Sequence, residues 1–143
     1  MQKSSVKISA ESDSVDLILS IKLDGEVFFR DNIPESGITI EHEFDDEPEV
    51  EHCLEFTLSG KMPFHTILDE DNEIIDDKVI RITSFELDST RIDHLLKKNT
   101  RYCHDYNGTC LPVDEPFQAF LGCNGTATFR FRSPGYVWIL EHS

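Results

Sequence analysis

Long apolar runs are missing from this chain of 143 residues. No stretch approaches the roughly 18 consecutive apolar residues that span a bilayer, and the N-terminal segment lacks the apolar block of a secretory signal. We therefore expect a soluble protein that is not exported and has no membrane partner. Its length and its 38% hydrophobic content suffice for one buried core. We expect a single domain over residues 1–143, with the first few residues flexible.

The motifs of common enzymes are also missing. The sequence has no G-x-S-x-G nucleophile motif, no phosphate-binding glycine loop and no H-E-x-x-H zinc pattern. Its six histidines are scattered over different segments. We predict that the protein is not an enzyme. The enzymatic alternative is a hydrolase that uses two carboxylates about 5 to 10 Å apart, and the sequence favours no particular pair.

Basic residues are few, with 13 Lys and Arg against 28 Asp and Glu, which gives a net charge of −15. Residues 41–77 contain fourteen acids and a single base, Lys61. Such a surface repels phosphate backbones, so we expect no nucleic-acid partner. A cation or a basic protein surface would be attracted to the middle of the chain, although a net charge far from zero also serves solubility alone.

The four cysteines include no C-x-x-C pair, and no histidine follows at zinc-finger spacing, so we expect no zinc site. Cys103 and Cys110 bracket a turn-forming segment, and a disulfide between them is geometrically possible. Without an export signal, free and partly buried thiols are favoured.

Apolar and polar residues alternate with period two through most of the chain, which is typical of strands with one buried face. The expected strands cover residues 15–23, 26–30, 38–44, 53–58, 79–87, 117–121, 127–132 and 136–140. Asp24-Gly25 predicts a tight hairpin turn, and the strands at 38–44 and 53–58 are expected to be antiparallel neighbours. The only helix candidate covers residues 92–98, which an extended edge would also fit. The pattern predicts an all-β fold, a single antiparallel β-sandwich of the jelly-roll type.

One acidic segment has the composition of a calcium site. Calcium requires several oxygen ligands on a flexible loop. The candidate ligands are Asp69, Asp71, Asn72, Asp76 and Asp77. The segment is not an EF-hand loop, because the sixth position from Asp69 is Ile74 where that loop requires glycine. The alternative is a solvated acidic hairpin loop that binds no cofactor.

Aromatic residues in irregular segments are candidates for stacking on sugar rings. Tyr102, His104, Tyr106 and Phe64 lie in segments that we expect to be exposed. The alternative is ordinary packing beneath loops. Trp138 lies within an apolar run, so we assign it to the core or to a subunit interface.

Several motifs in the second half of the chain support a family resemblance. They are Leu58-Ser59-Gly60-Lys61, His65-Thr66, Ile80-Arg81-Ile82, Leu87-Asp88, the run from Tyr102 to Thr109, the run from Phe120 to Thr126, and Ser133-Pro134-Gly135-Tyr136-Val137-Trp138-Ile139-Leu140-Glu141. Their order over residues 54–141 resembles small acidic β-rich proteins encoded by marine contractile-tailed bacteriophages, including cyanophages. The resemblance implies a virion accessory protein, assembled in the host cytoplasm. It carries over no catalytic residue.

Two functional hypotheses follow. The first is a non-enzymatic virion protein, either a capsid decoration or a tail-associated sandwich, whose partners are other virion proteins or further copies of itself. It predicts an exposed apolar patch of several hundred Å², which a lone monomer would not leave uncovered. The alternative is a calcium-assisted carbohydrate-binding module for a cell-surface glycan. It predicts that residues 69–77 and the platform of Tyr102, His104 and Tyr106 converge in space.

Overall fold

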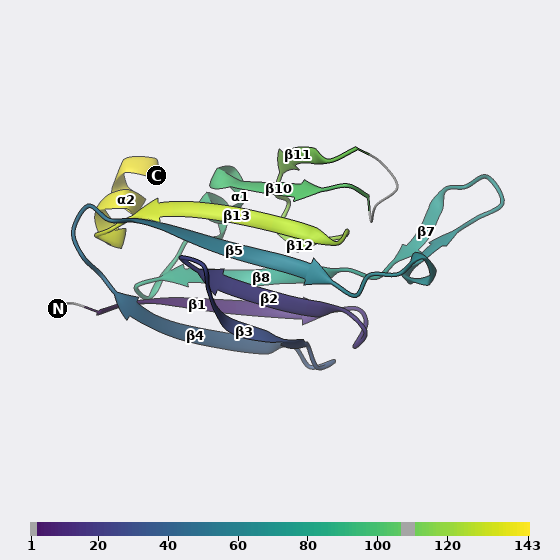
Figure 1. Ribbon diagram of the computed structural model, residues 1–143, viewed down its shortest axis with the longest axis horizontal. Helices are drawn as coiled ribbons and strands as arrows, with labels where there is room; N and C mark the ends of the chain where they lie inside the picture. The colour runs from purple at the N-terminus through teal and green to yellow at the C-terminus, as the bar shows by residue number, and fades with distance from the viewer. Residues whose placement is uncertain (1–2, 107–110) are drawn as a thin grey trace.

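Alternating burial along the strands folds residues 3–106 and 111–143, the part described by this computed structural model, into two facing antiparallel sheets (Figure 1). Sheet A contains β1 (Lys3–Ser12), β4 (Ile38–Asp45), β8 (Ile80–Leu87), β9 (Thr90–Arg91) and β12 (Phe120–Leu121), in the order β12-β8-β1-β4 with β9 paired to β8. Sheet B contains β2 (Ile18–Leu23), β3 (Glu26–Asn32), β5 (Glu51–Ser59), β10 (Thr100–His104), β11 (Val113–Pro116) and β13 (Gly125–Arg132), in the order β11-β10-β13-β5-β2-β3. The predicted antiparallel β-sandwich is confirmed.

Three shorter elements complete the fold. A separate two-stranded hairpin of β6 (Thr66–Leu68) and β7 (Ile74–Asp77) follows a 3-10 turn at Pro63–His65 and projects from one end of the sandwich (Figure 1). Helix α1 (Asp93–Asn99) matches the helix predicted at residues 92–98. Helix α2 (Gly135–His142) follows β13. No helix within the described part of the chain is long and apolar enough to cross a membrane.

The core lies between the sheets and follows the predicted alternation. On β13, Phe129 and Phe131 are buried while Arg130 and Arg132 are exposed on the opposite face. The rings of Phe129 and Phe85, the latter from sheet A, meet edge to face with centroids 5.3 Å apart. Such aromatic contacts add to the free energy of burying apolar surface, which dominates the stability of a sandwich of this size.

The N-terminal segment is a central strand of sheet A, which the sequence analysis did not predict. β1 pairs with β4 on one side and β8 on the other. Its Val6, Ile8 and Ala10 are buried at intervals of two. Lys7 and Ser9 alternate with these residues, so the strand pattern was present in the sequence but was passed over. Only residues 1 and 2 of the expected flexible start lie outside the described part.

The strands predicted at 38–44 and 53–58 form as β4 and β5, but the prediction that they are neighbours is wrong. β4 pairs with β1 in sheet A, whereas β5 pairs with β2 and β13 in sheet B. The segment between them contains Pro48 and crosses from one sheet to the other. The alternation of apolar and polar residues is the same whether the two strands pair with each other or lie in facing sheets, because in both cases one face of each strand covers the core.

The predicted C-terminal strand at residues 136–140 is also wrong, since this segment forms helix α2. A strand would bury Tyr136, Trp138 and Leu140 together, but only Trp138 is buried and the other two are 64% and 74% exposed. Trp138 packs edge to face on Phe129, with ring centroids 5.3 Å apart. It therefore belongs to the core, as one of the two predicted alternatives stated.

Two further segments differ from expectation. Only residues Phe120–Leu121 of the predicted strand at 117–121 are extended in a sheet, because Ala119 has a φ of 67° and breaks the strand. Residues expected to be irregular near Tyr102 form β10, which pairs with both β11 and β13.

Replacing Ile8 tests whether β1 is a core strand. Ile8→Ala should lower the free energy of unfolding by about 2 to 4 kcal/mol, because Ile8 is fully buried between two neighbouring strands. Lys7→Ala on the exposed face is the control and should change it by less than about 0.5 kcal/mol. Urea unfolding measures both. Equal, small losses would contradict the central position of β1.

Candidate functional site

A groove of about 350 Å³ lies where the β6–β7 hairpin meets the end of β10. It is lined by Thr66, Ile74 and Asp77 of the hairpin, by Tyr102, His104 and Tyr106, and by Glu115, Pro116, Gln118, Phe120, Gly122 and Cys123. The hairpin and the predicted aromatic platform therefore converge, although they are distant in sequence. Of the predicted site residues, the groove brings together Asp77, Tyr102, His104 and Tyr106.

A buried lysine anchors the hairpin at the edge of the groove. The side chain of Lys61 is fully buried, and its ammonium donates to Asp77 Oδ1 at 2.5 Å and to the carbonyl of Lys78. The backbone of Lys61 is held by both ends of the Asn124 amide, at 2.9 and 3.0 Å. Because a buried charge must be paired, these contacts fix the root of the hairpin.

The opposite wall is held by β10. His104 Nε2 lies 3.0 Å from Glu115 Oε1, and its ring contacts those of Tyr102 and Tyr106 with centroids 4.7 Å apart in each case. Opposite His104 in the β10–β13 ladder is Gly125, where a Cβ atom would collide with the carbonyl oxygen of Cys103. Gly125 therefore allows this close approach of the two strands.

Two groups in the groove have raised pKa values. Burial raises the pKa of the Tyr102 phenol, whose hydroxyl bonds the carbonyl of Cys123 and accepts from its N–H at 2.9 Å. Burial likewise raises the pKa of the Cys123 thiol. Both groups are therefore protonated at neutral pH.

The exposure of the aromatic residues differs from the prediction. Tyr102 and His104 are only 5% and 6% exposed, because both point inward from β10. Tyr106 is 46% exposed and Phe120 is 43% exposed. The lining of the groove thus combines the polar side chains of Glu115 and Gln118 with two accessible aromatic rings.

Three of the hairpin carboxylates predicted to bind calcium, those of Asp69, Asp76 and Asp77, have partners within the protein. Asp69 Oδ1 accepts from the backbone N–H groups of Asp71 and Glu73, and Asn72, with a φ of 62°, forms the turn. Asp76 pairs with Lys78 at 2.9 Å, in the same way that Asp77 pairs with Lys61. Within the described residues, no three His, Cys, Asp or Glu side chains form a group that could hold a metal ion. The five predicted ligands are therefore not gathered into one metal-binding group among these residues, and calcium binding by the hairpin stays a prediction.

Sequence reasoning missed Lys61, Asn124, Glu115, Gln118 and Phe120. Only Lys61 carried a signal, since it is the single base in an acidic segment of 37 residues, 41–77. Such a residue is a candidate for a buried pair. The sequence left open whether Cys103 and Cys110 form a disulfide or stay free thiols. Cys110 lies outside the described residues, and the described cysteines, Cys53, Cys103 and Cys123, are free.

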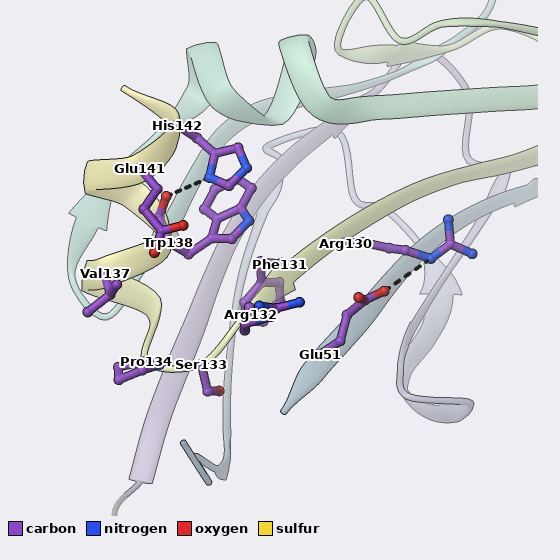
Figure 2. A pocket seen from close by; sticks show the side chains of 10 residues that line it. All are labelled: Glu51, Arg130, Phe131, Arg132, Ser133, Pro134, Val137, Trp138, Glu141 and His142. Carbon is purple, nitrogen blue, oxygen red and sulfur yellow. Dashed lines mark hydrogen bonds and ion pairs between the residues drawn. The ribbon is translucent and has the colours of Figure 1, made fainter. Parts of the chain in front are cut away.

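A larger cavity, of about 450 Å³, lies at the opposite end of β13 beside α2 (Figure 2). Some of its polar groups have partners, since Arg130 lies 3.9 Å from Glu51 and His142 Nδ1 donates to the carbonyl of Trp138 at 2.8 Å. The His142 ring covers Trp138 with centroids 4.2 Å apart (Figure 2). No exposed aromatic platform remains there among the described side chains, so we place the candidate site in the smaller groove.

A serine, a histidine and an aspartate near this cavity have the connectivity of a catalytic triad. His52 Nδ1 lies 2.7 Å from Asp24 Oδ2, and His52 Nε2 lies 2.9 Å from Ser133 Oγ. In serine hydrolases the hydroxyl faces the substrate and the carboxylate is buried. Here Ser133 is 2% exposed and the Asp24 side chain is 46% exposed, so the order of access is reversed. The three residues instead join the β2–β3 turn, β5 and the start of α2.

Neither a protein-family model nor a curated protein sequence matches the chain. Two solved structures share its fold. One is a selenomethionine form of vCBM60, described in connection with two circularly permuted families of calcium-dependent carbohydrate-binding modules; the TM-score is 0.50 over 88% of this chain and 89% of that one. The other is vCBM60 in complex with galactobiose, with a TM-score of 0.50 over 87% of this chain and 96% of that one. Both are 10% identical in sequence to this chain, so the similarity concerns the β-sandwich.

Ser133→Ala tests the structural role of the Ser133–His52–Asp24 group. It should lower the free energy of unfolding by about 1 to 3 kcal/mol, because Nε2 of His52 loses its buried partner. Ser20→Ala, at a half-buried serine on β2, is the control and should change stability less. Neither wild type nor variant should hydrolyse p-nitrophenyl acetate above buffer. Hydrolysis that Ser133→Ala abolishes without loss of stability would make Ser133 a nucleophile.

Proposed function

We propose that this protein is a non-catalytic carbohydrate-binding module that holds a neutral saccharide in the groove between the β6–β7 hairpin and β10. The observation that carries the proposal is the meeting of two exposed rings, Tyr106 and Phe120, with the polar side chains of Glu115 and Gln118 in one concave site. A groove of about 350 Å³ is within the range of about 300 to 1,000 Å³ that is usual for small-molecule sites.

The chemistry of the groove suits a sugar. A saccharide ring has an apolar face of C–H groups, which packs on an aromatic ring, and hydroxyls at its rim, which require donors and acceptors. The Glu115 carboxylate supplies acceptors and the Gln118 amide supplies both kinds of group. The contacts of Lys61 with Asp77 and Asn124 fix the hairpin wall of the groove before a ligand arrives.

The charge of the chain selects among sugars. With a net charge of −15, and with Glu115 and Asp77 in the groove, the protein repels uronic acids and sulfated glycans. Neutral saccharides meet no such barrier. Galactobiose, the neutral disaccharide in one of the similar structures, is therefore a suitable first ligand to test, before a wider array of neutral glycans.

Aromatic substitutions test the groove directly. Tyr106→Ala and Phe120→Ala should each weaken binding of galactobiose, or of the best neutral glycan from the array, by about tenfold, which is about 1.4 kcal/mol. Tyr136→Ala is the matched control, because Tyr136 is at least as accessible but lies on α2. Titration calorimetry measures all three. Binding that is absent for every neutral glycan, or that survives both groove variants, would contradict the proposal.

A role in a virion is the second candidate, and the apolar surface of the hairpin is the observation that favours it. Large apolar side chains are 46% to 66% exposed along this segment, namely Met62, Phe64, Ile67, Leu68, Ile74 and Ile75. The stability of an isolated two-stranded hairpin with this apolar surface is marginal in water unless a partner covers the surface. The acids Asp69, Glu70, Asp71 and Glu73 take part in no ion pair within the described residues, and with a net charge of −15 a second copy would be repelled. The expected partner is thus another particle protein with an apolar cleft and a basic rim.

Hydrogen exchange tests this second candidate. If the chain is mounted on a phage particle through the hairpin, backbone amides of residues 66–77 should exchange at least about tenfold more slowly in purified particles than in the free chain. The amides of β3 (Glu26–Asn32), an edge strand of sheet B, serve as the control and should be unchanged. Particles that lack the chain, or equal exchange at the hairpin, would exclude this role.

A further inference from the structure

Asp46 has a buried carboxylate with an incomplete set of partners. It directly follows β4 and is only 8% exposed. Its Oδ2 accepts a hydrogen bond from Ser4 Oγ at 2.7 Å, but its Oδ1 is buried without any hydrogen-bond partner in the described structure. A buried, unpaired carboxylate oxygen carries a large desolvation cost, so such an atom points to a missing proton, water or ion.

A second carboxylate meets the same hydroxyl. Ser4 Oγ also lies 3.1 Å from Asp88 Oδ2, while Asp88 Oδ1 accepts from the backbone N–H of Ser5 at 3.0 Å. A hydroxyl has a single hydrogen, which it can donate to one carboxylate at a time. The nearest oxygen of the other carboxylate then faces a lone pair of the Ser4 hydroxyl. Two negative groups therefore converge on Ser4 from strands that are distant in sequence.

No basic side chain compensates this charge within residues 3–106 and 111–143. Neither Asp46 nor Asp88 takes part in an ion pair there, and the adjacent Lys3 ammonium is bound to Asp45 at 2.5 Å on the exposed side. Two carboxylates that share a partly buried site repel each other, unless a proton or a cation lies between them.

The oxygen positions and the surrounding space fit a hard cation. Neighbouring oxygens on a calcium ion, each about 2.3 to 2.6 Å from the metal, are about 3 Å apart. The separations of 2.7 and 3.1 Å from Ser4 Oγ to the two carboxylates are hydrogen-bond lengths, and two ligands of one calcium ion can lie equally close. A hollow of about 230 Å³ lies beside Ser4 and Asp88, and its lining is completed by Lys3, Ser5, Glu43 and Ser89. Gly135 packs closely against the β8–β9 turn, since a Cβ there would lie 3.0 Å from both Asp88 Oδ2 and Leu87 Cδ2.

We propose that Asp46, Asp88 and Ser4 bind a calcium ion that joins β1, the end of β4, the β8–β9 turn and the start of α2. Water supplies the remaining ligands from the hollow, with Glu43 at its rim. The site lies at the end of the sandwich where β4 ends and α2 begins, opposite the hairpin (Figure 1). It is separate from the groove and does not depend on the proposed function.

Calcium-dependent melting tests the site. The melting temperature of the wild type should be at least about 3 °C higher in excess calcium than in chelator, because an ion that binds only the folded state stabilises it. Asp46→Asn should abolish this rise. The asparagine side chain keeps the shape of the aspartate and can still accept the hydrogen bond from Ser4, so the variant should fold. The matched control is the double variant Asp69→Asn and Asp71→Asn in the hairpin turn, which should keep the full rise.

Terbium luminescence gives a direct readout of the location. Trp138 is the single tryptophan of the chain, and it lies about one helical turn beyond Gly135, which faces Asp88. Excitation of Trp138 should therefore sensitise the luminescence of bound terbium, and added calcium should displace the terbium and lower the luminescence. Asp46→Asn and Asp88→Asn should each lower the signal at least about tenfold.

Each outcome bears on the site. A rise in melting temperature and a luminescence signal that are both lost in Asp46→Asn support it. No effect of calcium on the wild type would overturn it in favour of a shared proton, as would an effect that survives Asp46→Asn. A rise lost in the hairpin double variant would return the ion to the hairpin. Asp46→Asn should leave glycan affinity unchanged and Tyr106→Ala should leave the calcium effect unchanged, so the two proposals can fail separately.

Discussion

The contact of Phe129 with Phe85 across the core is the interaction on which the rest of the fold depends. Phe129 also packs against Trp138 and Phe131, so one side chain of sheet B meets sheet A, the C-terminal helix and its own strand. This contact sets the separation of the sheets and brings α2 back over the end of β13. With the middle of the sandwich filled by apolar groups, polar chemistry is confined to its two ends.

The same physics explains which elements could be predicted from the sequence. The alternation of Phe129 and Phe131 with Arg130 and Arg132 shows which side chains of the strand face the core and which face solvent. Alternation of this kind along the chain was sufficient to predict the sandwich. Alternation does not report which sheet a strand joins, so β4 and β5 were wrongly made neighbours. It also failed at residues 136–140, where a continuous apolar run fits either a strand or a helix. The contact of Trp138 with Phe129 decided in favour of the helix.

The candidate groove was only half visible in the sequence. Tyr102, His104 and Tyr106 could be grouped because they are close along the chain, and the acidic hairpin could be recognised from its composition. That these segments meet depends on Lys61, whose buried ammonium holds Asp77, and on Asn124, which holds the backbone of Lys61. Such contacts join residues 16 and 63 positions apart, and no local pattern encodes them.

Burial, more than the number of acids, determines where a cation is needed. The hairpin turn carries the densest acids, but Asp69 and its neighbours are solvated or receive N–H groups, and water screens their repulsion. Asp77 is partly buried and already has the ammonium of Lys61. Asp46 is almost fully buried and has only a share of one hydroxyl. A composition-based search therefore favours the hairpin, whereas the electrostatic cost of an unpaired charge is greatest at Asp46.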